Sequence, residues 1–210
     1  MKIAIDESVK LASAALQARL RDGARRVVAV VGIEPGAGCT TIVAMMAAWM
    51  VEGQGLDPIA VDFIGGPKGL SARFGDAGAS GLRALGQGRV GVADVVRRGP
   101  RGFNLVGIGP EPASDAGPDA IAGLRRLIAE APPTSGPILV DAPPPLSRVD
   151  GILAAEVAGA ALLVVPADRS PRQLVERTCT ELAAHRVEIL GAVLNYHRHR
   201  MPGWLYRRFR

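Results

Sequence analysis

With 210 residues, of which 48% are hydrophobic and only 4% aromatic, the chain predicts one domain whose sizeable core is built from Ala, Val, Leu and Ile. No apolar run is long enough to span a bilayer, and acidic residues at positions 6 and 7 argue against a secretory signal, so a cytoplasmic protein is expected. The two cysteines form no disulfide framework, so a reducing cytoplasm is expected. The formal net charge is a mild +5, but arginines crowd the last stretch. Such a tail can be a solvated end or meet an anionic membrane surface, an acidic partner or nucleic acid, of which nucleic acid is not the expected partner.

The first elements predicted along the chain are a helix, a strand and a second helix. Residues 6–22 have the pattern of an amphipathic helix. Residues 26–32 form a nearly unbroken run of Val, which predicts a strand buried on both faces. A loop with two glycines follows, and a long apolar helix is predicted over residues 40–52.

The remaining elements alternate between strands and helices. Strands are predicted over residues 58–62, 103–109, 137–141, 160–166 and 187–195, and helices over residues 92–97, 120–130, 148–157 and 171–185. Residues 63–90 are rich in glycine and are expected to hold short helices and loops. The alternation predicts an α/β fold with a doubly wound, mostly parallel sheet, whose ligands bind beyond the carboxyl ends of the strands.

The glycine-rich loop after the first strand has the pattern of a phosphate-binding loop. Its glycines let the backbone approach a ligand, and the N–H groups at the start of the next helix can bind phosphate. Thr40 stands where a hydroxyl could hold Mg²⁺, but Cys39 occupies the position at which such a loop carries lysine. The predicted nucleotide-binding residues are Gly36, Ala37, Gly38, Cys39, Thr40 and Thr41. A plain strand-to-helix turn is the alternative for this stretch alone.

Two further strands are each predicted to end in an aspartate on the same rim as the loop. Asp62 and Asp141 are therefore candidate catalytic residues, and together with Thr40 they are candidate metal ligands. One carboxylate could order metal-bound water, while the other could hold the metal or take a proton from the nucleophile. Each aspartate alone could merely cap a strand end, but three such features at matching strand ends favour a nucleotide site.

Five spaced segments resemble the motifs of one family: residues 35–41, 59–62, 138–144, 191–195 and 201–208. The first four are similar to the P-G-x-G-K-[ST]-T loop, the second Walker motif, the Walker B segment and the G-V-V-L-N strand of the bacterial tyrosine kinases (BY-kinases). These are cytoplasmic partners of polysaccharide co-polymerases and belong to the ParA/MinD-like class of P-loop ATPases. The last segment resembles the tails of proteins encoded with exopolysaccharide systems.

The resemblance implies a domain organisation, a ligand and a setting. It implies an N-terminal helix over residues 1–24, a P-loop NTPase-like domain over 25–196 and a basic aromatic tail over 197–210. The expected cofactors are ATP and Mg²⁺, and Asn195 is expected to read adenine. The implied partner is an inner-membrane polysaccharide co-polymerase or chain-length protein at the inner face of the membrane. The tail could contact anionic lipid, and a homo-oligomer is left open.

Several positions depart from the family pattern. Cys39 replaces the Walker lysine, Ile64 replaces the second acid of the D-x-D motif, and the E-x-x-R-x-x-R motif is absent from the first helix. The C-terminal tyrosine cluster is absent too, since Tyr196 and Tyr206 are the only tyrosines. The departures favour a degenerate protein that regulates or scaffolds capsular or exopolysaccharide synthesis and export with weak or no ATP turnover. The alternatives are an active tyrosine kinase or ATPase of the same system, and a ParA/MinD-like positioning factor for cellulose or pilus assembly.

The cysteine in the loop also carries an expectation about charge. A thiol at a helix start is expected to have a lowered pKa, because the helix dipole and free amides favour the thiolate. A thiolate at Cys39 would repel triphosphate, so nucleotide binding is expected to weaken as pH rises through that pKa.

Overall fold

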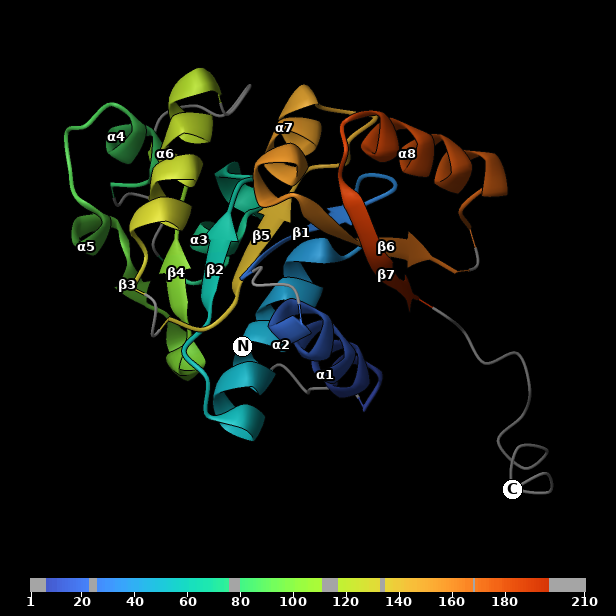
Figure 1. Ribbon diagram of the computed structural model, residues 1–210, viewed down its shortest axis with the longest axis horizontal. Coiled ribbons are helices and arrows are strands. Elements are labelled where there is room, and N and C mark those ends of the chain that lie inside the picture. Colours follow the sequence, from blue (N-terminus) through green and yellow to red (C-terminus); the bar gives the residue numbers. More distant parts are fainter. Residues whose placement is uncertain are drawn as a thin grey trace.

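The computed structural model describes residues 7–22, 26–75, 80–110, 117–132, 135–167 and 169–196, and a seven-stranded sheet runs through its centre (Figure 1). In spatial order the strands are β3 (Arg97–Arg98), β4 (Asn104–Val106), β2 (Ile59–Asp62), β5 (Ile138–Ala142), β1 (Val27–Gly32), β6 (Ala160–Pro166) and β7 (Glu188–Asn195). Every neighbouring pair is parallel except β3 with β4. The predicted doubly wound, mostly parallel sheet is confirmed.

Helices cover both faces of the sheet (Figure 1). One face packs against α1 (Glu7–Asp22), α2 (Cys39–Gln54) and α3 (Leu70–Arg73). The other packs against α4 (Leu82–Gly86), α5 (Val92–Val95), α6 (Gly117–Glu130), α7 (Val149–Ala158) and α8 (Arg172–Ala184). The core therefore consists of two apolar layers, one on each side of the sheet.

The central strand β1 shows why this sequence forms a three-layer fold. All six of its residues are buried. Val28 and Val30 pack in the layer beneath α2, whereas Val27, Ala29 and Val31 pack in the opposite layer. Because successive side chains of a strand point to opposite faces, an unbroken apolar run satisfies both layers at once.

Some elements differ from their predicted bounds for identifiable reasons. The strand predicted over residues 103–109 has only three residues, because the chain beyond Val106 bonds to the start of α4 instead of continuing the ladder. The carbonyls of Gly107 and Ile108 accept hydrogen bonds from the N–H groups of Leu82 (2.9 Å) and Arg83 (3.2 Å). The helical turn predicted over 92–97 ends at Val95, after which β3 begins.

Two predictions concern membranes. Among the helices of the described ranges, none has the length and apolarity needed to cross a bilayer. The predicted basic aromatic tail over residues 197–210 lies outside the described residues.

Burial of Phe103 gives a test of the core. Its side chain has no exposed surface and packs edge-to-face against Phe74, with ring centroids 5.6 Å apart. Phe103→Ala should lower the free energy of unfolding by about 3–5 kcal/mol, because it leaves a cavity, and urea denaturation measures the change. Leu11→Ala, at a side chain 71% exposed on α1, should change it by less than about 0.5 kcal/mol. Similar losses in the two variants would contradict this packing.

Candidate functional site

The loop that joins β1 to α2 has the backbone conformation of an anion-binding turn. Gly36 and Gly38 have φ angles of 77° and 98°, in the left-handed region that favours glycine. Gly38 precedes the first residue of α2, and the first turn of this helix has no side-chain cap and no acidic residue. The N–H groups at the start of a 16-residue helix therefore face the loop, and the first turn of the helix itself carries no carboxylate that would compete for them.

The end of β7 holds this loop in place. Asn195 donates a hydrogen bond from Nδ2 to the carbonyl of Ala37 at 2.8 Å, and its Oδ1 accepts one from the N–H of Tyr196 at 2.9 Å. A Cβ on Gly38 would lie only 2.2 Å from Asn195 Nδ2, so this contact also requires glycine. The side chain of Asn195 thus touches the loop backbone, and its role toward adenine stays a prediction.

A second contact reaches the loop from the segment before α8. Arg169 forms an ion pair from Nε to Glu34 at 2.7 Å and donates from Nη2 to the carbonyl of Gly36 at 3.1 Å. Its guanidinium also lies 5.4 Å from the ring centroid of Tyr196. The loop is therefore held from outside by side chains of two different segments.

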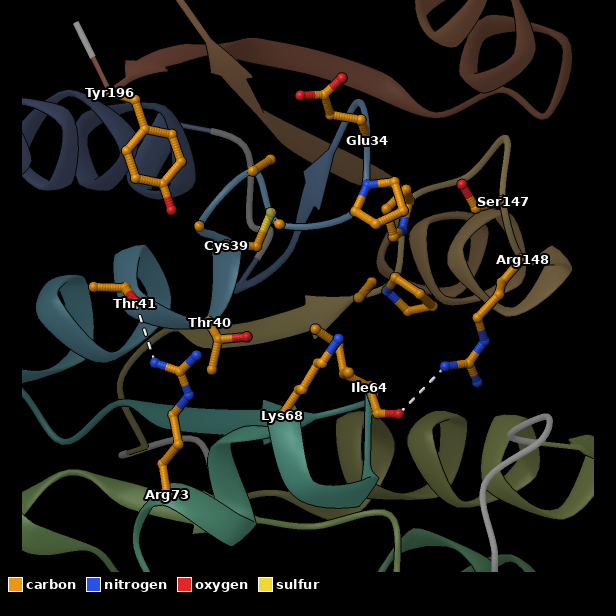
Figure 2. Close-up of a pocket in the computed structure, with 17 residues that line it drawn as sticks. Glu34, Cys39, Thr40, Thr41, Ile64, Lys68, Arg73, Ser147, Arg148 and Tyr196 are labelled. Atoms are coloured by element: carbon orange, nitrogen blue, oxygen red, sulfur yellow. Dashed lines mark hydrogen bonds between the residues drawn. The ribbon is translucent and has the colours of Figure 1, made fainter. Parts of the chain in front are cut away.

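A cavity of about 340 Å³ lies against the loop (Figure 2). Six of the seven residues predicted to bind nucleotide, 36–41, line it, whereas the seventh, Asn195, is not among its lining residues. Its other walls are Ile64, Lys68 and Arg73 from the segment after β2, residues of the 142–148 segment after β5, and Tyr196. The size lies in the range of small-molecule sites, and the place, beyond the carboxyl ends of parallel strands, is where ligands of such sheets bind.

The walls of the cavity carry more positive than negative charge. Lys68, Arg73 and Arg148 line it, and its one acidic side chain, Glu34, is paired with Arg169. Sequence patterns missed the three cations. Lys68 and Arg73 lie in the glycine-rich segment, which has no periodic pattern, and Arg148 follows a run of prolines. A net positive cavity suits an anionic ligand such as a polyphosphate.

The two predicted catalytic aspartates lie side by side. Asp62 and Asp141 are register partners on β2 and β5, and neither side chain has exposed surface. Asp62 accepts three backbone hydrogen bonds: Oδ1 from Ile64 (3.2 Å) and Gly65 (2.9 Å), and Oδ2 from Ser71 (2.8 Å). Both oxygens of Asp62 are therefore engaged with the segment that follows β2.

Asp141 has the opposite environment. Neither of its carboxylate oxygens has a hydrogen-bond partner of normal geometry among the described residues. Burial raises the pKa of this carboxyl well above its usual value; Asp62 adds to the rise, while the neighbouring Thr40 hydroxyl and Arg73 oppose it. A buried carboxyl that lacks well-formed hydrogen bonds and lies beside a hydroxyl fits a Mg²⁺ site.

The three predicted metal ligands differ in how free their oxygen atoms are to bind Mg²⁺. Thr40 and Asp141 fit Mg²⁺, whereas the hydrogen bonds of Asp62 leave it less suited, and its metal and catalytic roles stay predictions. The described residues hold no group of three or more His, Cys, Asp or Glu side chains that could bind a metal. Mg²⁺ commonly takes one or two protein oxygens and completes its shell with water and phosphate oxygens.

The predicted lowering of the Cys39 pKa is wrong. The side chain is only 8% exposed, and burial raises the pKa of its thiol well above the ordinary value, with a further rise from Asp141. Loss of hydration therefore outweighs the favourable helix start. Cys39 is a neutral thiol, and the expected loss of nucleotide binding with rising pH has no basis.

The contrast between the two aspartates gives a paired test. Because the folded-state pKa of Asp141 lies above the usual 3.8, the folded protein binds this proton more tightly than the unfolded chain does. Without ligand, the free energy of unfolding should fall as pH rises through that pKa. Asp141→Asn should remove this part of the pH dependence, measured by urea denaturation from about pH 4 to about pH 8.

Asp62→Asn is the matched control. An amide nitrogen cannot accept a hydrogen bond, so at least one backbone N–H would lose its partner, at a cost of about 1–3 kcal/mol. If Asp141→Asn lowered the free energy of unfolding more than Asp62→Asn at neutral pH, the hydrogen bonding described for both aspartates would be contradicted.

No protein-family model matches the chain. Two curated relatives are similar in sequence: AmsA of Erwinia amylovora and EpsB of Ralstonia nicotianae, both named as tyrosine-protein kinases. Identity is 23% to AmsA and 27% to EpsB, each over 190 residues that make up 90% of this chain. The matches cover 26% of AmsA and 25% of EpsB, so the chain spans about a quarter of the length of these relatives.

Solved structures show the same fold. The kinase domain of the Escherichia coli tyrosine kinase ETK has a TM-score of 0.81 and 21% identity, and the match covers 92% of this chain and 76% of that chain. MinD of Pyrococcus horikoshii, a septum site-determining protein complexed with Mg-ADP, has a TM-score of 0.65 and 20% identity, with 88% and 76% covered. The fold predicted from the motifs is confirmed: the chain has the fold of the ETK kinase domain and of MinD, and it is similar in sequence to two proteins named as tyrosine-protein kinases.

Proposed function

We propose that the chain binds MgATP and regulates or scaffolds capsular or exopolysaccharide synthesis and export, with weak or no ATP turnover. The observation that carries the proposal is the cavity itself. It combines an uncapped helix start with three lining cations, yet has a neutral cysteine where the lysine of a P-loop belongs. Such a site favours binding of a polyphosphate over its cleavage.

Binding would use the loop and the metal together. The N–H groups at the start of α2 would hold phosphate oxygens, as in other helix-terminus sites. Thr40 and Asp141 would hold Mg²⁺, which neutralises phosphate charge when bound. The similarity to MinD, which was solved with Mg-ADP, supports this pair of ligands.

Weak turnover follows from what the cavity lacks. Catalysis of phosphoryl transfer depends on fixed charge at the outer phosphates in the transition state. The buried thiol of Cys39 supplies none. Asp62 is also poorly placed as a general base, because both its oxygens accept backbone hydrogen bonds and it has no exposed surface.

The polysaccharide setting rests on sequence resemblance. The motifs over residues 35–195 resemble those of the BY-kinases, and residues 201–208 resemble tails encoded with exopolysaccharide systems. The names of AmsA and EpsB support the kinase part of this resemblance. The partner proposed is an inner-membrane polysaccharide co-polymerase or chain-length protein, at the inner face of the membrane.

Replacing Cys39 tests whether the loop lacks a charge that would strengthen nucleotide binding. Cys39 lines the cavity, so a lysine there would reach the outer phosphates. Cys39→Lys should tighten MgATP binding about ten- to a hundred-fold, which corresponds to one charge-assisted contact. Titration calorimetry measures it, with Cys39→Ser as the uncharged control. Tight binding by the wild type that is unchanged in Cys39→Lys, or ATP hydrolysis at the rate of an active kinase, would contradict the proposal.

The tail gives a test of membrane association that rests on sequence alone. Five arginines and the apolar side chains of Trp204, Leu205, Tyr206 and Phe209 lie within residues 198–210. Each arginine should contribute about 1 kcal/mol near an anionic surface. Deletion of residues 197–210 should abolish co-sedimentation with phosphatidylserine vesicles, and neutral vesicles serve as the control. Undiminished binding by the shortened chain would show that the tail is not the attachment site.

A further inference from the structure

We propose that Lys68 supplies the positive charge that the loop lacks at Cys39, by contacting the outer phosphates of the nucleotide from the opposite wall of the cavity. The inference rests on the proposed function, because it needs MgATP in this cavity. It assigns the replacement charge to a segment far from the loop in sequence.

Lys68 is placed to reach such a ligand. It is the last residue of a 3-10 turn, Gly66–Lys68, that follows β2, and its side chain is exposed and lines the cavity. In Figure 2 the side chain extends from this turn into the cavity, and Thr40 and Cys39 line the cavity on its other side. An ammonium group on this path would meet phosphates bound at the start of α2.

The other cations of the cavity already have partners. Arg148 forms an ion pair with Asp150 at 2.6 Å and donates to the carbonyl of Ile64 at 3.3 Å. Arg73 donates to the hydroxyl of Thr41 at 3.4 Å, at one side of the cavity (Figure 2).

By contrast, no ion pair or hydrogen bond of the Lys68 side chain is found within the described part of the chain. Lys68 is therefore the lining cation whose charge is available to a ligand without breaking an existing contact.

The segment that carries Lys68 is fixed by Asp62. The three hydrogen bonds to this carboxylate come from Ile64, Gly65 and Ser71, on both sides of the turn. Gly69 lets the chain pass closely, because a Cβ there would lie 2.4 Å from Asp62 Oδ2. The backbone on either side of Lys68 is thus tied to the end of β2, which sets the position of its side chain relative to the loop.

The ammonium group of lysine is well suited to binding the outer phosphates of a nucleotide. Its ammonium is a compact point charge with three donors, so it can bind a phosphate from several directions, unlike the planar guanidinium of arginine. Because the side chain is exposed and lines the cavity, its charge is not fixed for a transition state, and we expect it to contribute to binding of the ground state. This agrees with a site that holds nucleotide and turns it over slowly.

A double-mutant cycle tests the inference, with MgATP binding measured by titration calorimetry on the full chain. Lys68→Met should weaken MgATP binding about tenfold. This is the lower end of the range for one charge-assisted contact, because the ammonium group is exposed to solvent. In the Cys39→Lys background the same change should have little effect, because the new lysine then contacts the phosphates. Lys68→Arg should keep most of the affinity.

Arg177→Met is the control, since it removes one exposed positive charge from α8, outside the cavity lining. It should leave binding unchanged. A Lys68→Met variant that binds like Arg177→Met, or that loses the same factor with and without Cys39→Lys, would overturn the role of Lys68 while leaving the nucleotide site intact. If neither the wild type nor Cys39→Lys binds MgATP, the nucleotide site itself is refuted and the inference falls with it.

Discussion

The buried carboxylate of Asp62 is the constraint on which one whole wall of the cavity depends. It sits at the end of a central strand without exposed surface and accepts three backbone hydrogen bonds. A buried carboxylate is costly unless it is satisfied, so the segment after β2 must fold back over it. This fold places Lys68 and Arg73 opposite the loop. The aspartate thus shapes the site through the backbone that it binds.

Its register partner Asp141 is buried as well, but lacks comparable hydrogen bonds. Its carboxyl is buried, has no hydrogen-bond partner of normal geometry among the described residues, and lies close enough to Cys39 to raise the pKa of the thiol. In a loop with lysine, the ammonium would offset the charge of this carboxylate; with cysteine at that position, the neutral Thr40 hydroxyl stabilises it without supplying a charge. A bound metal ion would supply positive charge here, so the proposed function implies that the cysteine both weakens phosphate binding and leaves Asp141 dependent on a cation.

Much of this arrangement could be predicted from the sequence, because it depends on local pattern. An unbroken apolar run fixes β1 as a buried strand, and an aspartate directly after each of two such runs fixes the rim on which Asp62 and Asp141 meet. The loop could be predicted for the same reason, since left-handed positions such as Gly36 and Gly38 favour glycine. These features need no knowledge of distant contacts.

The features that the sequence could not predict all depend on contacts between distant segments. Lys68 stands in a glycine-rich stretch, and hydrogen bonds between Asp62 and the flanking backbone hold this stretch beside the cavity. The strand β4 stops early because Gly107 bonds to Leu82. The pKa of Cys39 follows from its burial, which overrides the local effect of a helix start. Periodicity and spacing carry none of this information.

The position of a cation decides whether such a site binds or cleaves. A lysine in the loop is held at the start of a long helix, where its charge is fixed relative to the phosphate being transferred. Lys68 lies on a short 3-10 turn at the opposite wall, and its exposed side chain must be ordered when the ligand binds. Ordering of the Lys68 side chain costs conformational entropy each time a ligand binds. Its charge is therefore not preorganised for a transition state. A charge placed in this way would suit the binding role proposed for the chain better than turnover of the nucleotide.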